Sequence, residues 1–295
     1  MFLDLKKFLN FLIIKKNLKV WGAFSAVISL VLVIYALSLP NTYTSRAVVI
    51  PVDQNLDNNV GTSSLNALRG IGFGNFSFNA QGFVLDKDKT LNTIRSISFV
   101  EYFLNDEILK GFYAAKTYDP KTGQLLIDEK VFDEENNKWV RKVNPILGAK
   151  PSAQEFFIQY STRLMVVEDR RTGLISIGLE HISPKFSKYF VEHLVESLNK
   201  YMSEEAAKEA SLFVDYLKLE IQKNNIKDID AVFSLLLQQN IQKMMYAEAK
   251  PDFALKYVSK PVIPLFKSGP SRAIICIFGF IFFQVLIMCY FLYKF

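Results

Sequence analysis

The sequence predicts an α+β membrane protein, in which two transmembrane helices flank an extracytoplasmic α/β base domain with a long projecting helix or helical hairpin. Three observations predict this fold class. Two apolar runs without a charge lie near the chain ends, at residues 20–39 and 273–292. A stretch without glycine or proline covers residues 185–250. Short β-branched and aromatic runs bounded by turn residues occur on both sides of that stretch.

The two apolar runs have the length of membrane spans. Each holds about 20 residues, and such a helix rises about 30 Å, the thickness of the hydrocarbon core. A buried helix of a soluble protein seldom lacks a polar face over this length. We therefore expect transmembrane helices at 20–39 and 273–292. The alternative for the first run is a cleaved signal peptide ending near Ala36-Leu37-Ser38, but such peptides have an apolar core of roughly 7–15 residues.

Lysine placement predicts the topology of the chain. Five lysines and one acid, Asp4, lie in residues 1–19, and the positive-inside rule keeps such a segment in the cytoplasm. Two spans would return residues 293–295 to the same side. We therefore expect residues 40–272 to be exported, which describes a multi-pass protein of the bacterial inner membrane with a periplasmic main domain.

Charge and cysteine usage exclude some functions. The net charge is +6, of which residues 1–19 supply five lysines less one aspartate, so the basic character is a topology signal and predicts no nucleic-acid partner. Both cysteines, Cys276 and Cys289, lie in the second apolar run. The exported region therefore has no disulfide and no thiolate metal site.

The first part of the exported region alternates between strand, loop and helix signals. Residues 43–51 are β-branched and aromatic and end with a proline, which predicts a strand. Residues 53–82 are rich in Asn, Ser and Gly, as is typical of a mobile loop. Apolar residues recur in steps of three and four behind Asp88, which predicts a helix near 88–105. Residues 117–143 are polar and rich in turn residues.

Two further strands are expected in the second half of the region, at 163–167 and 173–182. A charged turn that contains Arg170 and Arg171 joins them, so they should form a hairpin. After Pro251 the pattern predicts a returning strand that the prolines at 261 and 264 end.

The stretch 185–250 predicts the long helical region. Apolar residues recur at three- and four-residue steps from Phe186 to Leu219. One unbroken helix of this length would be on the order of 100 Å long. We expect a bend or hairpin near Lys223, where helix propensity falls, and a second helical run from 230 to 249.

Residues capable of chemistry are few, and no catalytic, cofactor-binding or metal-binding residue is predicted. His181 and His193 have no cysteine partner outside the membrane runs, so core or surface imidazoles are favoured over general bases. The glycines at 70, 72 and 74 lack the third glycine of a dinucleotide fingerprint. The acids at 128–135 lack the spacing of a calcium loop, and a solvated turn is favoured. Arg170 and Arg171 could contact an anionic polymer, although exposed arginines are common in turns.

The chain resembles the Wzz-type chain-length determinants of the polysaccharide co-polymerase family, in the form without a tyrosine-kinase domain. The resemblance covers nearly the whole chain. It follows the strand at 43–51, Leu91 to Phe103, the run from Thr172 to Pro184 and the long helix. Its most specific part is a proline-rich motif before the second span, although Pro264 to Pro270 is not an even three-residue proline repeat. The motif residues are Pro261, Pro264, Pro270, Arg272 and Gly279.

The resemblance implies a non-enzymatic regulator that sets the chain length of O-antigen, capsule or exopolysaccharide. It implies ring-like homo-oligomers that act with a membrane polysaccharide polymerase, the glycan polymer and the lipid bilayer, without a cofactor. Two alternatives remain open. One is an inner-membrane component of a capsule or exopolysaccharide export complex, and the other is a two-span sensor, which the three-residue C-terminal tail disfavours.

Overall fold

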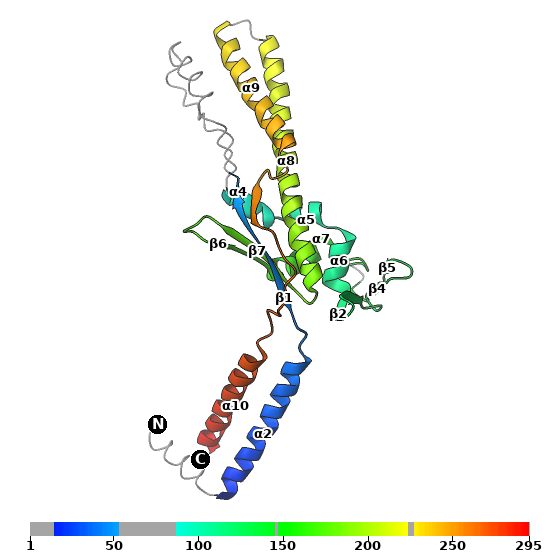
Figure 1. Ribbon diagram of the computed structural model, residues 1–295, viewed down its shortest axis with the longest axis vertical. Coiled ribbons are helices and arrows are strands. Elements are labelled where there is room, and N and C mark those ends of the chain that lie inside the picture. The colour runs from blue at the N-terminus through cyan, green and yellow to red at the C-terminus, as the bar shows by residue number, and fades with distance from the viewer. Residues whose placement is uncertain (1–14, 53–86, 145–146, 224–226, 295) are drawn as a thin grey trace. The chain divides into compact units, whose positions relative to one another are not determined.

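The computed structural model describes residues 15–52, 87–144, 147–223 and 227–294 (Figure 1). The chain forms two compact units. Unit 1 comprises Met1–Tyr43 and Leu265–Phe295, and unit 2 comprises Thr44–Pro264. The loop expected at 53–82, with its glycines at 70, 72 and 74, lies outside the described residues.

Unit 2 has an α+β fold, and its first strand begins at the last residue of unit 1. In chain order its elements are β1 (Tyr43–Pro51), α4 (Lys87–Ile94), α5 (Ile97–Phe103), α6 (Asp106–Leu109), the π-helical turn η1 (Lys110–Ala114), β2 (Ala115–Asp119), β3 (Gln124–Ile127), β4 (Phe132–Asp133), β5 (Lys138–Trp139), α7 (Ala153–Arg163), β6 (Leu164–Glu168), β7 (Ile175–His181), α8 (Pro184–Lys223), α9 (Lys227–Ala249) and β8 (Leu255–Ser259).

A four-stranded sheet in the order β6-β7-β1-β8 forms one layer of unit 2. The strand predicted at 43–51 is confirmed as β1, the predicted hairpin as the antiparallel pair β6 and β7, and the returning strand as β8, which pairs antiparallel with β1. Ser45, Ala47 and Val49 of β1 are buried at every second position, as expected for a strand with one face on the core. The turn-rich segment between α6 and α7 holds two small hairpins, β2-β3 and β4-β5.

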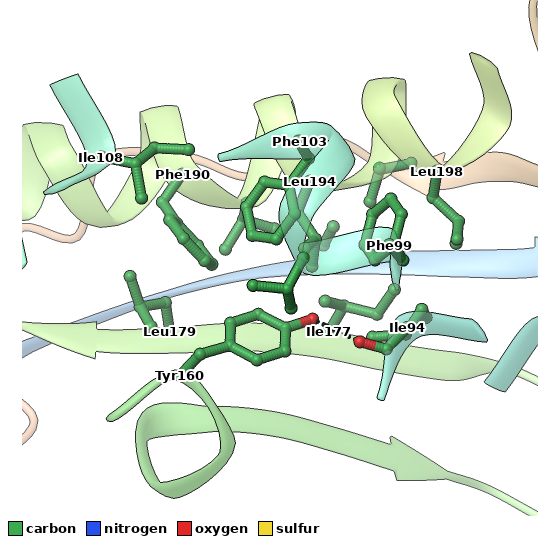
Figure 2. Packing of buried hydrophobic residues seen from close by; sticks show 14 of the residues in the cluster. Ile94, Phe99, Phe103, Ile108, Tyr160, Ile177, Leu179, Phe190, Leu194 and Leu198 are labelled. Atoms are coloured by element: carbon green, nitrogen blue, oxygen red, sulfur yellow. Dashed lines mark hydrogen bonds between the residues drawn. The ribbon is translucent and has the colours of Figure 1, made fainter. Parts of the chain in front are cut away.

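The core of unit 2 lies between this sheet and helices α5, α7 and α8 (Figure 2). Phe99 and Phe103 of α5 and Phe190 of α8 meet Ile177 of β7 there, and all four side chains are buried. Tyr160 of α7 is also buried, and its hydroxyl donates to the Ile94 carbonyl (2.7 Å; dashed line in Figure 2). This bond satisfies the polar tip of a large apolar side chain.

The single helix expected near 88–105 is wrong, because the structure has two helices there. The helix is interrupted at Ser96, which has an extended backbone and is the N-cap of α5. Its Oγ accepts a hydrogen bond from the Phe99 amide (3.2 Å). Serine side chains that bond the backbone compete with a continuing helix and favour a new start. The break lets α5 bury Phe99 and Phe103, while Ile94 at the end of α4 also remains in the core.

Within the stretch 185–250, helix α8 ends at Lys223 as predicted, and α9 covers Lys227–Ala249. Helix α8 has 40 residues, which corresponds to about 60 Å of helix. Its first half supplies core residues such as Phe190 and Leu194. Its second half packs against α9 and forms a helical hairpin with it (Figure 1), in which Lys243 of α9 pairs with Glu209 of α8 (3.2 Å).

Unit 1 contains helices α2 (Lys15–Ser38) and α10 (Arg272–Lys294), which pack against each other. Within the described ranges, the structure contains no helix with both the length and the apolar character that a membrane span requires. The prediction of transmembrane helices at 20–39 and 273–292 is therefore wrong for this part of the chain. The predictions of an inner-membrane location and of an exported main domain rested on these spans, so they are wrong for the same reason.

Candidate functional site

The predicted motif residues are divided between the two units. Arg272, the first residue of α10, is held at the end of α2. Its Nη2 donates to the Leu39 carbonyl (3.0 Å), just after the last residue of α2, and to Asn41 Oδ1 (3.1 Å). A cation at a helix C-terminus is favoured by the helix dipole. Arg272 therefore fixes the start of α10 against the end of α2.

Pro270 lies in a segment that is tied to the chain beyond α2. It follows a cis peptide bond, and the two residues before it pair with Thr42. The Thr42 amide donates to the Gly269 carbonyl (2.9 Å), and the Ser268 amide donates to the Thr42 carbonyl (2.8 Å). Backbone hydrogen bonds, as well as Arg272, therefore fix the segment that leads into α10.

Gly279 provides the close approach between α2 and α10. A Cβ atom at this position would lie 2.9 Å from Cδ2 of Leu32, which is closer than side chains pack. Further along α10, the Gln284 amide donates to Ser25 Oγ of α2 (2.6 Å). Small residues at such a contact let two helix backbones approach each other.

The remaining two motif residues lie in unit 2, after β8. Pro261 is buried and Pro264 is half-buried. Between them, the Val262 carbonyl accepts a hydrogen bond from the Ser45 hydroxyl of β1 (2.8 Å). Arg272, Pro270 and Gly279 therefore lie where chain segments are held together, and Pro261 and Pro264 flank such a contact.

A buried serine pair holds α8 to the sheet and was not singled out in the sequence. The Ser45 amide of β1 donates to Ser187 Oγ (2.8 Å), and the Ser187 hydroxyl donates to the Leu179 carbonyl of β7 (2.6 Å). Ser187 therefore connects the first turn of α8 to two neighbouring strands. The sequence signal was a serine among the apolar positions near the start of the helix.

His181 is a structural imidazole with both ring nitrogens in use. Its Nε2 lies 2.9 Å from the Gly111 carbonyl, and its Nδ1 accepts the Ser183 amide (3.0 Å), which assigns the proton to Nε2. Burial, with the nearby Arg163 cation, lowers the pKa of His181 to about 4. A neutral ring with no free nitrogen has no lone pair for a substrate. His181 is therefore a buried imidazole.

His193 lies at the C-terminal end of α5. Its Nε2 is 3.1 Å from the Phe103 carbonyl and 3.3 Å from Asn105 Nδ2, and its ring stacks on Tyr189. Since Asn105 Oδ1 accepts the Ile108 amide as an N-cap, its amide orientation is fixed. This imidazole therefore also has a packing role.

Two acids in turns, Asp133 and Asp169, accept hydrogen bonds from their own turns. Asp133 accepts hydrogen bonds from the backbone and side chain of Asn136, which lower its pKa. Asp169 accepts the amide of Arg171 and the hydroxyl of Thr172 in the β6-β7 turn. Among the described residues, no group of three or more His, Cys, Asp or Glu is placed to hold a metal ion.

Comparison with known proteins gives matches among solved structures. No protein-family model matches the chain, and no curated protein sequence does. Two of the structural matches are polysaccharide co-polymerases. One is a fragment of WzzB from Salmonella Typhimurium, at 12% identity over 78% of this chain and 100% of the fragment, with a TM-score of 0.29. Another is a full-length bacterial polysaccharide co-polymerase, at 12% identity over 95% of this chain and 96% of that chain, with a TM-score of 0.33.

A third match is a mutant of the Shigella flexneri lipopolysaccharide O-antigen chain-length regulator WzzB, at 11% identity over 77% of this chain and 100% of that chain, with a TM-score of 0.21. The names of these proteins refer to the family that the sequence resembles. All three TM-scores are below 0.5, so the function proposed below is argued from the chain's own residues.

Proposed function

We propose that this chain is a non-enzymatic regulator of polysaccharide chain length that acts beside a membrane polysaccharide polymerase. The observation that carries the proposal is an apolar stripe on the second half of α8. Leu212, Phe213, Tyr216 and Leu219 are between 45% and 65% exposed, although α8 already buries its opposite face against α9. An exposed apolar stripe on a helix is typical of a surface that binds another protein.

A different face of the same helix makes the contact within the fold, so the stripe is not needed for folding. Ala210, Val214 and Leu217 are buried at the α8-α9 contact. The stripe lies on a different side of the helix, because residues 212, 216 and 219 follow the four- and three-residue spacing of one helix face. We assign this face to assembly of several copies, with the polymerase or the growing polymer meeting the assembled surface.

The chemistry of the described residues supports a scaffold role over catalysis. The buried polar side chains Ser45, Ser187 and Asn199 bond to backbone groups of neighbouring elements, and the His181 ring does the same. The hydrogen bonds of these side chains therefore hold neighbouring elements together. A regulator that presents surfaces to a polymerase needs this rigidity and no reacting group.

The experiment that tests the proposal is deletion of the gene, followed by gel analysis of the surface glycan. Loss of a regulator should leave polymer in place but replace a preferred length by a broad, mostly shorter distribution. Loss of an export component should instead abolish surface polymer or trap it inside the cell. An unchanged profile would contradict both readings.

A further inference from the structure

The four-stranded sheet of the described chain has two edge strands, β6 and β8. Each edge carries an exposed valine, Val167 of β6 at 62% and Val258 of β8 at 56%. An edge strand presents a row of backbone donors and acceptors, and with apolar side chains beside them it is a template for pairing with another chain. Proteins that remain free of such pairing close at least one of their edges.

The direction of the backbone shows which groups of β8 face outward. The Val52 amide, just after β1, donates to the Ala254 carbonyl (2.9 Å), which therefore points toward β1. Successive residues in an antiparallel pair direct their backbone groups to alternate sides. The amide and the carbonyl of Leu255 and of Tyr257 therefore point away from β1, to the edge. Since the register of β8 shifts beyond Tyr257, these two residues are its regular outward positions.

Asn199 of α8 occupies the first of these positions in the way a neighbouring strand would. Its Oδ1 accepts the Leu255 amide (2.7 Å), and its Nδ2 donates to the Leu255 carbonyl (2.9 Å). Residues opposite each other in an antiparallel pair exchange the same two bonds. Because the Asn199 side chain is buried, this position is closed to another chain. Only Tyr257 remains as a regular outward position, and strands usually need about three residues or more.

We propose that Asn199 closes the β8 edge against strand addition by a second copy of this chain. The strand that would add is β6, because it is the other edge of the same sheet and is apolar except for Glu168. Without the side-chain amide, the backbone groups of Leu255 would need new partners, and an incoming strand supplies both. With this edge closed, the α8 stripe is left as the surface for assembly, a consequence that rests on the proposed function.

Cross-linking of the full-length chain in cells tests this role. Val167→Cys and Val258→Cys place one thiol on each edge, in a chain whose own thiols are removed by Cys276→Ser and Cys289→Ser. Three strand spacings, about 14 Å, separate the two edges within one copy, so a shorter bis-maleimide reagent joins only different copies. Adding Asn199→Ala should raise the cross-linked species several-fold on a denaturing gel. An unchanged yield would overturn the proposal.

Two controls separate an opened edge from a loss of stability. Gly111→Ala with the same cysteines is destabilised by its clash with Phe186 but keeps Asn199, so its cross-linking should stay at the parent level. Leu126→Cys with Val258→Cys places one thiol on β3, outside the four-stranded sheet, and should not respond to Asn199→Ala. An equal rise in either control would show that partial unfolding joins the copies, and it would contradict the role of Asn199.

Asn199→Asp is a second variant that removes a single bond. Its carboxylate can still accept the Leu255 and Ala254 amides, whereas the Leu255 carbonyl loses its donor. Cross-linking should rise above the parent level and stay below that of Asn199→Ala. Failure of this proposal is distinct from failure of the chain-length function, because cross-linking reports contacts between copies and the glycan profile of a deletion strain reports polymer length.

Discussion

Asn199 of α8 completes the hydrogen bonds of Leu255, the first residue of β8. Its Nδ2 donates to the Leu255 carbonyl (2.9 Å), and its Oδ1 accepts the Leu255 amide (2.7 Å) and the Ala254 amide (2.9 Å). One buried amide side chain thus satisfies three backbone groups where the chain enters the sheet. Since β8 leads to the proline-rich motif, this contact positions the segment that follows.

Replacing Asn199 by alanine should lower the free energy of unfolding by about 2–4 kcal/mol, because three backbone groups lose their partner in a buried site. Urea unfolding followed by circular dichroism would measure this. The exposed Asn136→Ala is the matched control and should cost less than about 1 kcal/mol. Equal effects of the two substitutions would show that the Asn199 contact contributes little.

Gly111→Ala should be strongly destabilising because of a packing clash. A Cβ atom at Gly111 would overlap the ring of Phe186, and the Gly111 carbonyl also accepts the His181 bond. Overpacking of this kind costs about 1–3 kcal/mol. The double variant Gly111→Ala with Phe186→Leu should recover part of the loss in a thermal melt, since the smaller side chain makes room. No recovery would mean that the clash is not the cause.

Protonation of His181 should weaken the fold as the pH falls. The folded-state pKa of about 4 lies below the ordinary value of 6.5, so the unfolded chain binds the proton more readily. Stability is therefore full above pH 6.5 and is lost as the pH falls from 6.5 toward 4. The loss between pH 7 and pH 5 should be about 2 kcal/mol from this residue.

Urea unfolding of His181→Gln at both pH values isolates this contribution. The variant should be less stable at pH 7 but should lose less stability on acidification than the wild type. An identical response of His181→Gln and wild type would contradict the assignment of a depressed pKa.

Charge on the α8 stripe should disrupt assembly. We expect Leu212→Lys with Leu219→Lys to reduce cross-linked species larger than a dimer several-fold, because an apolar interface excludes unpaired charges. Lys218→Glu is the control, since Lys218 is exposed on α8 but lies off the stripe. Cross-linking of the full chain in cells, read on a denaturing gel, gives the measurement. An unchanged ladder in the double variant would exclude the stripe as the assembly face.

Local patterns predicted much of unit 2. The strand at 43–51, the β6-β7 hairpin and the end of α8 at Lys223 follow from β-branched runs, turn residues and helix propensity, which act over a few residues. The break at Ser96 was missed because a serine side chain can cap a new helix or point to solvent in a continuous one, and tertiary packing decides between the two.

Contacts distant in sequence could not be predicted. Asn199 reaches Leu255 across 56 positions, and Ser45 reaches Val262 across 217. Hydropathy alone predicted membrane spans at 20–39 and 273–292, and the described helices did not confirm them. The proline-rich motif was found in sequence, and its assigned role in regulation stays a prediction.

The most direct measurement of the central claim is the length distribution of surface polysaccharide in a deletion strain and in the same strain carrying the gene on a plasmid. Polymer should persist after deletion, with its preferred length replaced by a broad, mostly shorter distribution. The preferred length should return with the plasmid. Complete loss of surface polymer, or a distribution that deletion leaves unchanged, would contradict the account.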